Sequence, residues 1–370
     1  MRVKLEEVCE RGSSNLKQSD VIDKTGEYPV YGATGYLGNV DFYHQEKPYV
    51  AVVKDGAGIG RTTLYPSKSS IIGTMQYLLP KENVLPEYLC YVVRYMHLEK
   101  YFTGATIPHI YFKDYKNEEF NLDTLDRQIE IVGILKKVEN IIELRRQEIE
   151  KLDDLIKSRF VEMFGEPENN NKAWPVKSLD KLCTVGSSKR VYQSEQSAEG
   201  VPFWRISDLV NKIDTGTVDS TLFISEIKYT ELKQAGLVPV TGDILVTSRG
   251  TLGRCYIIQD EDRFYFQDGM ISWLSNYSEE ITPLYLQYLF TMSGFRKQID
   301  NMQAGSTVAY LSIVMLKKLQ VMVPDKALQD QFATFVAQTD KSKLTIQKSL
   351  DELEILNKAL MQKYFGGNEV

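Results

Sequence analysis

Two long amphipathic segments dominate the pattern of apolar and polar positions. The first runs from Asp126 to Phe164 without proline and with one glycine, and its apolar residues recur at alternating spacings of three and four. This is the heptad pattern of helices that pack along a seam. A similar, more polar pattern lies near the end of the chain. The predicted seam residues are Leu135, Val138, Ile142, Arg145, Ile149, Leu152, Ile156, Arg159 and Met163 in the first segment, and Phe332, Phe335, Thr339, Ser342, Ile346, Ser349, Leu353, Leu356 and Leu360 in the second.

These two segments are expected to pair with each other. A helix from Asp126 to Phe164 is about 58 Å long at ~1.5 Å per residue and could not bury its seam alone. Each segment ends at a Phe-Gly dipeptide, Phe164-Gly165 and Phe365-Gly366, where glycine favours a helix end. Because one chain carries both helices, the sequence predicts that residues 126–164 pair antiparallel with residues 328–365 of the same chain.

Shorter elements precede each long helix. The β-branched runs Val50–Val53 and Ile244–Val246 are typical of strands. The stretches Glu87–Tyr101 and Leu284–Ile299 have apolar residues at helical spacing directly after a proline, which predicts one helix in each. Each long helix is therefore predicted to follow a mixed globular domain.

The whole pattern occurs twice, at a spacing near 200 residues, which indicates an internal repeat. The matches follow the same order in both halves, and the second half carries extra residues, interpreted as loops. The matched segments are Leu5–Cys9 with Leu179–Cys183, Gly58–Arg61 with Thr251–Arg254, Pro86–Tyr91 with Pro283–Tyr288, Gly104–Ile107 with Gly305–Val308, Leu125 and Gln128 with Leu328 and Gln331, and Phe164-Gly165 with Phe365-Gly366. The chain is thus predicted to be two copies of one unit.

Composition fits this organisation. A chain of 370 residues argues for two or three domains. The 43% hydrophobic content, with only 24 glycines and 12 prolines, argues against collagen-like or disordered classes. The first residues contain no apolar core of signal-peptide length, and no apolar run is long enough for a membrane span. We therefore expect a cytoplasmic protein with no membrane contact.

The net charge of −6 at first argues against a nucleic-acid partner. Its distribution weakens that objection. Residues 1–122 carry 14 basic and 15 acidic side chains and residues 172–324 carry 16 of each, whereas residues 123–171 carry 8 and 12. The acidic excess therefore lies mainly in the first long helix, and the two globular regions are nearly neutral.

Several kinds of catalytic site are disfavoured by missing motifs. The four cysteines and three histidines form no metal-binding spacing, and Gly56–Arg61 lacks the third glycine of a dinucleotide loop. Asp219 with Glu226 and Lys228 resembles a nuclease motif only loosely, and the first half has no counterpart. The chain contains no Pro-Pro dipeptide, which excludes the Pro-Pro-Tyr/Phe motif of amino-methyltransferases. We expect a protein that is not an enzyme and binds no metal.

Recognition remains. Tyrosines and basic groups gather in turns, where side chains can contact phosphates and base edges. The turn that ends at Arg61 is expected to present this arginine, as the equivalent turn presents Arg254, although either could be a solvated charge. The candidate DNA-binding residues are Tyr31, Thr34, Arg61, Thr106, His109, Tyr111, Lys189, Arg190, Arg205, Arg249, Arg254, Ser306, Thr307 and Tyr310.

Three further groups of residues join the duplication and the two long helices that end in Phe-Gly. These are Tyr28-Pro29-Val30-Tyr31-Gly32-Ala33-Thr34-Gly35 with Gly38, then Val201–Leu209, and then Gly242-Asp243-Ile244-Leu245-Val246 with Gly305-Ser306-Thr307. In these features, over nearly its whole length, the chain resembles the DNA-specificity subunit of type I restriction-modification enzymes.

The resemblance implies an α+β fold with two pseudo-symmetric α/β target-recognition domains separated by two long antiparallel, coiled-coil-like helices. The expected boundaries are 1–122 and 172–324 for the recognition domains, and 123–166 and 325–366 for the helices. Each domain would read one half of a bipartite site in double-stranded DNA. Two adenine-N6 methyltransferase subunits, which use S-adenosylmethionine, would dock on the helices. Restriction (motor-nuclease) subunits, which use ATP and Mg²⁺, would complete the enzyme, and this chain itself would hold no cofactor.

The sequence departs from an exact repeat in two places. The entry to the first long helix reads Phe120-Asn121-Leu122-Asp123, where the second half has Val323-Pro324-Asp325. The first half shows no clear counterpart of the segment from Pro202 to Leu209, so the two halves are expected to read different sequences. Two alternatives remain. One is an adaptor whose paired helices join proteins without reading bases, and the other is a self-sufficient restriction nuclease, which the missing carboxylate and nucleotide motifs disfavour.

Overall fold

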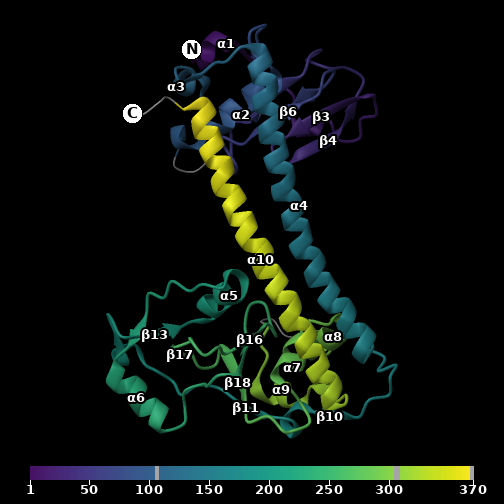
Figure 1. Cartoon of the computed structure of the whole chain (residues 1–370), viewed down its shortest axis with the longest axis vertical. Coiled ribbons are helices and arrows are strands. Elements are labelled where there is room, and N and C mark those ends of the chain that lie inside the picture. Colours follow the sequence, from purple (N-terminus) through teal and green to yellow (C-terminus); the bar gives the residue numbers. More distant parts are fainter. Residues whose placement is uncertain (105–107, 304–308, 367–370) are drawn as a thin grey trace. The chain divides into compact units, whose positions relative to one another are not determined.

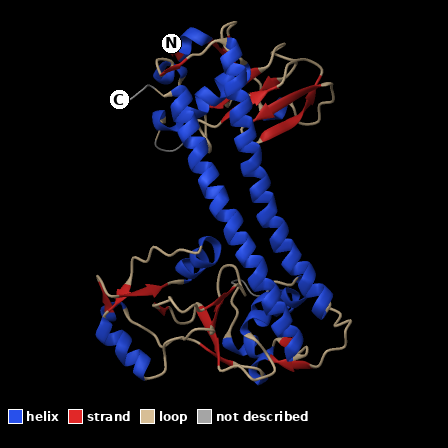
Figure 2. Cartoon of the chain, in the orientation of Figure 1, coloured by secondary structure: helices blue, strands red, loops and turns tan. Residues whose placement is uncertain are grey.

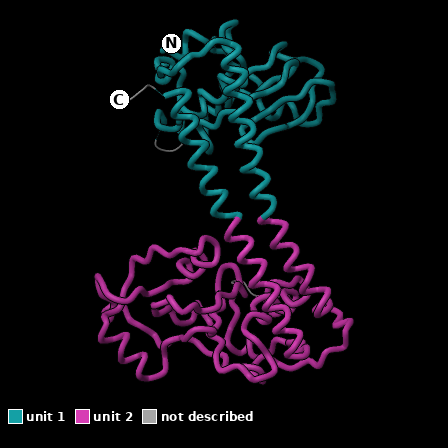
Figure 3. Tube along the Cα trace, viewed as in Figure 1, with its two compact units in different colours: residues 1–148, 346–370 teal, residues 149–345 magenta. Residues whose placement is uncertain are grey.

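The computed structural model describes residues 1–104, 108–303 and 309–366. The chain forms two compact units, coloured separately in Figure 3. Unit 1 comprises residues 1–148 and the segment from residue 346 onward, and unit 2 comprises residues 149–345. Two helices of 40 residues, α4 (Leu125–Phe164) and α10 (Lys326–Phe365), contribute to both units (Figure 1). The two predicted long helices are confirmed.

Both units contain the same pair of small sheets, mixed with helices (Figure 2). Unit 1 has a four-stranded sheet in the order β2-β8-β5-β6, and unit 2 has one in the order β11-β18-β15-β16. Each unit adds an antiparallel two-stranded sheet, β1-β9 or β10-β19. The strands are β1 (Arg2–Lys4), β2 (Cys9–Ser13), β5 (Tyr49–Val53), β6 (Thr62–Tyr65), β8 (Met75–Pro80) and β9 (Glu119–Asn121), and β10 (Val176–Ser178), β11 (Thr184–Gly186), β15 (Ile244–Thr247), β16 (Cys255–Ile257), β18 (Ile271–Ser275) and β19 (Gln320–Met322). The predicted repeat is therefore visible as a repeated topology.

A further sheet in each unit corrects one expectation. In unit 1 it has the order β4-β3-β7, and in unit 2 the order β12-β14-β13-β17. Strand β3 pairs parallel with β7 through Tyr31 and Ile71, and β13 pairs parallel with β17 through Trp204 and Phe266. The segment Tyr28–Gly32 is thus the counterpart of the Val201–Trp204 strand that the sequence analysis did not find. The strands are β3 (Tyr28–Gly32), β4 (Gly35–Val40) and β7 (Ser70–Ile71), and β12 (Gln196–Ser197), β13 (Val201–Trp204), β14 (Phe223–Ile224) and β17 (Tyr265–Phe266).

The shorter helices are less alike between the units. Unit 2 has α5 after β13 and α6 after β14. In unit 1, the described residues between β3 and β7 form strands and loops and no helix. Helices α5 and α6 account for extra residues in the second half, so these residues are not all loops, as the sequence analysis interpreted them. The shorter helices are α1 (Leu5–Val8), α2 (Pro86–Tyr95) and α3 (Phe112–Tyr115), and α5 (Ile206–Thr215), α6 (Glu226–Gln234), α7 (Pro283–Leu289), α8 (Ser293–Met302) and α9 (Ile313–Lys318).

Both helices predicted after a proline were too long. Helix α2 ends at Tyr95, and His97 then adopts a left-handed conformation with φ of 51° before a short 3-10 turn. In unit 2 the predicted single helix is two, because Met292 is extended (ψ 134°) and separates α7 from α8. Apolar residues continue at helical spacing through both breaks, so the pattern alone did not reveal them.

The long helices pair antiparallel within each unit. In unit 1, the core contains Ile131 and Leu135 near the start of α4 together with Phe365 at the end of α10. Further along, Arg146 Nη2 lies 2.7 Å from Glu354 Oε1. As the residue number rises along α4 it falls along α10, which confirms the predicted antiparallel pairing.

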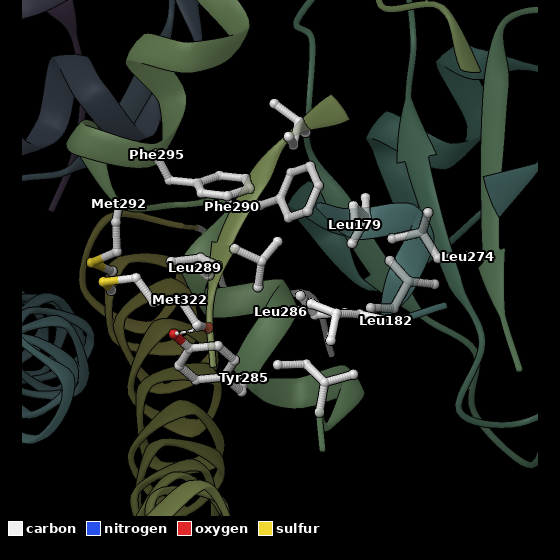
Figure 4. Close-up of a cluster of buried hydrophobic side chains, with 14 of the residues drawn as sticks. Leu179, Leu182, Leu274, Tyr285, Leu286, Leu289, Phe290, Met292, Phe295 and Met322 are labelled. Atoms are coloured by element: carbon white, nitrogen blue, oxygen red, sulfur yellow. Dashed lines mark hydrogen bonds between the residues drawn. The ribbon is translucent and has the colours of Figure 1, made fainter. Parts of the chain in front are cut away.

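In unit 2 the same pairing completes a large apolar core. Phe160 packs against Phe332 with ring centroids 5.5 Å apart, and Lys343 Nζ lies 2.6 Å from Asp153 Oδ1. Figure 4 shows this core around α7, where Tyr285 donates its hydroxyl to the backbone oxygen of Met322 at 3.1 Å. The predicted fold class is confirmed: two repeated mixed α/β domains combine with two long antiparallel helices.

The seam of α10 was predicted partly in the wrong register. Val336 and Leu350 are buried in the seam, whereas Ser342 and Leu356 are exposed. The repeat explains this, because Val336 and Leu350 lie 201 positions after Leu135 and Ile149, as Phe365 does after Phe164. The equivalent position to Gln128 is consequently Gln329 and not Gln331. Among the described residues, no helix is long and apolar enough to cross a membrane.

Candidate nucleic-acid interface

In unit 1, most described candidate residues lie around the turn between β5 and β6. Gly56, Gly58 and Gly60 in this turn have φ of 85°, 89° and 80°, a region that residues with a side chain rarely adopt. A Cβ on Gly60 would lie 2.7 Å from the backbone nitrogen of Glu99. The glycines therefore allow a tight turn that packs closely against the segment around Glu99. This turn leaves Arg61 exposed.

Arg61 connects this turn with the turn between β3 and β4. Its Nη1 donates to the backbone oxygen of Ala33 at 3.0 Å, next to the exposed Thr34. Tyr31 lies on the adjoining strand and stacks on Tyr65 with ring centroids 4.2 Å apart. Burial raises the pKa of the Tyr31 hydroxyl, so this group stays a neutral donor and acceptor at pH 7. The contact between Arg61 and Ala33 thus brings the β5–β6 turn next to the β3–β4 turn. Three candidate residues, Tyr31, Thr34 and Arg61, lie around this contact.

His109 and Tyr111 approach the other side of the β5–β6 turn. Gly56 donates its backbone N–H to the oxygen of Pro108 at 3.0 Å, and His109 Nδ1 lies 2.7 Å from Asp55 Oδ1. The rings of His109 and Tyr111 lie 6.4 Å apart at 24°. Sequence reasoning missed Asp55, which lies 54 residues before its partner.

In unit 2, the equivalent turn between β15 and β16 carries Arg249 and Arg254. The Arg249 guanidinium lies over the Tyr310 ring at 5.2 Å, and Arg249 is exposed. Arg254 instead faces Asp214 of α5, to which Nη1 donates at 3.1 Å and Nη2 donates as well. These hydrogen bonds hold the pKa of Asp214 below its ordinary value. Of the two arginines, Arg249 is exposed, whereas the Arg254 guanidinium is engaged by a carboxylate.

The remaining basic candidates of unit 2 lie near β13 and β17. Arg205 precedes α5 and lies 3.4 Å from Asp208, and Arg190 Nε lies 2.9 Å from Asp268. Lys189 is exposed, and its backbone is fixed by the Tyr265 hydroxyl, which accepts from Lys189 N–H at 2.8 Å. Arg190 and Arg205 therefore have local partners that would compete with a phosphate. The candidates Thr106, Ser306 and Thr307 lie outside the described residues.

The chain matches the family model described as type I restriction modification DNA specificity domain over residues 1–154 and again over residues 171–355. It is 24% identical over 353 residues to a putative type I restriction enzyme specificity subunit of Haemophilus influenzae, covering 91% of this chain and 88% of that protein. It is also 24% identical over 338 residues to the MjaVIII type I restriction enzyme specificity subunit of Methanocaldococcus jannaschii, covering 86% of this chain and 78% of that protein.

Two solved structures share the fold. The S subunit of a type I restriction-modification system from M. genitalium superposes with a TM-score of 0.58 at 18% identity, covering 99% of this chain and 96% of that chain. A chain from a structural study of complex assembly and conformational transition of the type I R-M system gives a TM-score of 0.59 at 14% identity, covering 98% and 97%. The fold of this chain is therefore shared with these two solved structures.

Proposed function

Because the chain belongs to the type I restriction modification DNA specificity family, we propose that it is the DNA-recognition subunit of a type I restriction-modification enzyme and reads a bipartite site in double-stranded DNA. The observation that carries this proposal is the duplication of one sheet with one exposed turn, β5–β6 in unit 1 and β15–β16 in unit 2. Two copies of one reading element, with different side chains, suit a site made of two different halves.

The chain's own chemistry supports a subunit without catalytic activity. Burial raises the pKa of the Cys9 and Cys183 thiols to about 12 and also raises those of Cys90 and Cys255. Since the thiolate is the nucleophilic form, these thiols are unreactive at pH 7. The carboxylate of Glu226, considered above for a nuclease, is held by Arg263, whose Nη1 donates at 3.0 Å. Methylation and cleavage would then come from partner subunits that carry S-adenosylmethionine, or ATP and Mg²⁺.

We place the methyltransferase docking surface on the flank of the helix pair. In unit 1, α4 exposes Ile134, Ile141 and Leu144, and α10 exposes Leu356. Ile134 and Ile141 are one heptad apart, directly before the seam residues Leu135 and Ile142. Exposed apolar groups at regular helical spacing are typical of protein interfaces. Leu155 in unit 2 occupies the same helix position as Leu356, 201 residues earlier, so each unit offers a related position, as two docked copies would need.

Selection of bound sequences from a random DNA pool tests this function. The chain is purified with its methyltransferase subunit, and the selected DNA is sequenced. The proposal predicts two short defined sequences separated by an unspecified gap. Binding to methyltransferase without any selected sequence would instead support an adaptor. Cleavage of DNA by the purified chain with Mg²⁺ alone would support a self-sufficient nuclease and contradict the proposal.

A further inference from the structure

The β5–β6 turn of unit 1 and the β15–β16 turn of unit 2 are built on the same backbone hydrogen bonds. Gly60 N–H donates to the backbone oxygen of Val53 at 2.9 Å, and Gly253 N–H donates to the backbone oxygen of Thr247 at 2.8 Å. Lys54 N–H donates to Thr74 at 3.0 Å, as Ser248 N–H does to Met270 at 2.9 Å. These bonds make Lys54 equivalent to Ser248, and the next residue, Asp55, equivalent to Arg249.

The segment that approaches each turn is equivalent as well. Ile110 N–H donates to Lys54 at 2.9 Å, and Leu311 N–H donates to Ser248 at 3.0 Å. In each unit the preceding residue then forms an isolated antiparallel bridge with the turn, Asp55 with His109 and Arg249 with Tyr310. Asp55–His109 and Arg249–Tyr310 are therefore the same pair of positions in two copies of one fold.

The residues next to these pairs are of the same type in both units, whereas the residues of the pairs themselves differ in type. Ile110 and Leu311 are both buried and apolar, and Gly56 and Gly250 both have positive φ. The fold thus dictates an apolar residue on one side of the pair and a glycine on the other. At the pair itself, one unit has a carboxylate with an imidazole, and the other has a guanidinium on a phenol ring. The shared fold therefore accepts a negative charge at Asp55 and a positive charge at the equivalent Arg249. The requirements of the fold alone do not explain which residue types occupy these two positions.

The local contacts leave a reading edge in each unit. In unit 1, His109 engages Asp55 Oδ1, and the nearest described cation to Oδ2 is Lys54 Nζ at 3.7 Å. In unit 2, the Arg249 guanidinium lies over the Tyr310 ring, with Cζ 5.2 Å from the ring centroid, and Arg249 is an exposed residue. A carboxylate accepts from a base amino group, whereas the edge of a guanidinium donates to guanine O6 and N7.

We propose that Asp55 and Arg249 are specificity-determining residues at equivalent positions, with Asp55 reading a base amino group in one half-site and Arg249 reading guanine in the other. This inference rests on the proposed function. His109 and Tyr310 are positioning residues, because each holds its partner's orientation. The two units thereby read opposite hydrogen-bonding patterns with one scaffold, which supplies a reason why the two half-sites differ in sequence.

The experiment uses the chain in complex with its methyltransferase subunit and measures binding to every single-base variant of the recognised site. D55A should lower affinity for the cognate site by about 5- to 150-fold and abolish discrimination at one base pair of one half-site. R249A should do the same at one guanine of the other half-site. Each variant should leave the opposite half-site and the gap unchanged.

Matched variants separate base reading from general effects. D41A removes an exposed acid elsewhere in unit 1, and R263K alters another arginine that lies over a tyrosine ring, that of Tyr229, also at 5.2 Å. Both should keep wild-type discrimination. Thermal unfolding checks the fold, and D55N replaces D55A if the latter unfolds, under the same criteria. Unchanged discrimination, or equal weakening on all sequences, would overturn the inference, whereas a wild-type complex that selects no bipartite site would overturn the proposed function itself.

Discussion

Gln128 and Gln329 make the same contacts in the two units. Each is buried in the first turn of a long helix. Its Oε1 accepts a hydrogen bond, 2.8 Å long, from the backbone N–H of the residue directly before α2 or α7, which is Leu85 or Thr282. The side-chain amide of Gln128 donates to the backbone oxygens of Asn83 and Asp123. That of Gln329 donates to the backbone oxygens of Glu280 and Pro324. One side chain thus fastens each recognition domain to its long helix.

Removing either glutamine should destabilise its unit. Q128L introduces an apolar side chain of similar size and leaves the Leu85 N–H and two carbonyl oxygens without their partner, which costs about 1–3 kcal/mol. The same holds for Q329L. Urea unfolding of the full chain measures the loss. Gln331, the residue that sequence matching aligned with Gln128, is exposed, and Q331L should stay within ~0.5 kcal/mol of wild type. Equal effects of Q329L and Q331L would contradict the assignment.

The error over Gln331 shows what the sequence could and could not reveal. Heptad spacing and two Phe-Gly ends were sufficient to predict both long helices and their pairing. In α10, however, Lys343 and Asn357 occupy seam positions. Polar residues in the seam made the neighbouring Ser342 and Leu356 fit the pattern equally well, and the register came out one residue wrong at these positions.

The candidate site was predictable only in part. Glycines and arginines in turns identified the β5–β6 and β15–β16 turns, because positive φ requires glycine there. Asp55 was missed because its role depends on His109, a contact between distant parts of the chain that no local pattern records. The ion pair of Arg254 with Asp214 was equally invisible, since Asp214 lies 40 residues earlier on α5.

Alkaline pH should weaken the fold through the buried thiols. The pKa of Cys9 is raised by burial from an ordinary value of 9.0 to about 12. Above pH 9 the unfolded chain releases this proton while the folded chain retains it, so the free energy of unfolding falls as pH rises from about 9 towards 12. Urea unfolding at several pH values should show a shallower decline for C9A than for wild type. An identical decline would show that Cys9 titrates normally in the folded state.

The proposed docking surface predicts a selective loss of partner binding. I141D places a charge within the exposed apolar flank of α4, and burying it against a partner should weaken methyltransferase binding at least about tenfold, or ~1.4 kcal/mol. Calorimetric titration measures this affinity. N140D adds a charge at the adjacent exposed position, away from the seam, and should bind normally. If both variants bind like wild type, the partner docks elsewhere.

The two long helices should set the gap between the half-sites. Inserting one heptad into α4 after Glu148 and another into α10 after Ser349 preserves the seam, because these positions are equivalent in the repeat. Seven residues lengthen each helix by about 10.5 Å, close to three base pairs at ~3.4 Å each. Binding selection should then return both half-sites with a gap longer by about three bases. An unchanged gap with altered half-sites would contradict this role.

The most direct measurement is a base-resolution map of adenine methylation in cells with and without this gene. The account predicts that cells with the gene carry N6-methyladenine at one bipartite motif, with a modified adenine in each half, and that this motif loses all its methylation when the gene is deleted. Identical methylated motifs in both maps, with the partner methyltransferase expressed, would contradict the claim that this chain directs an adenine methyltransferase to its DNA sequence.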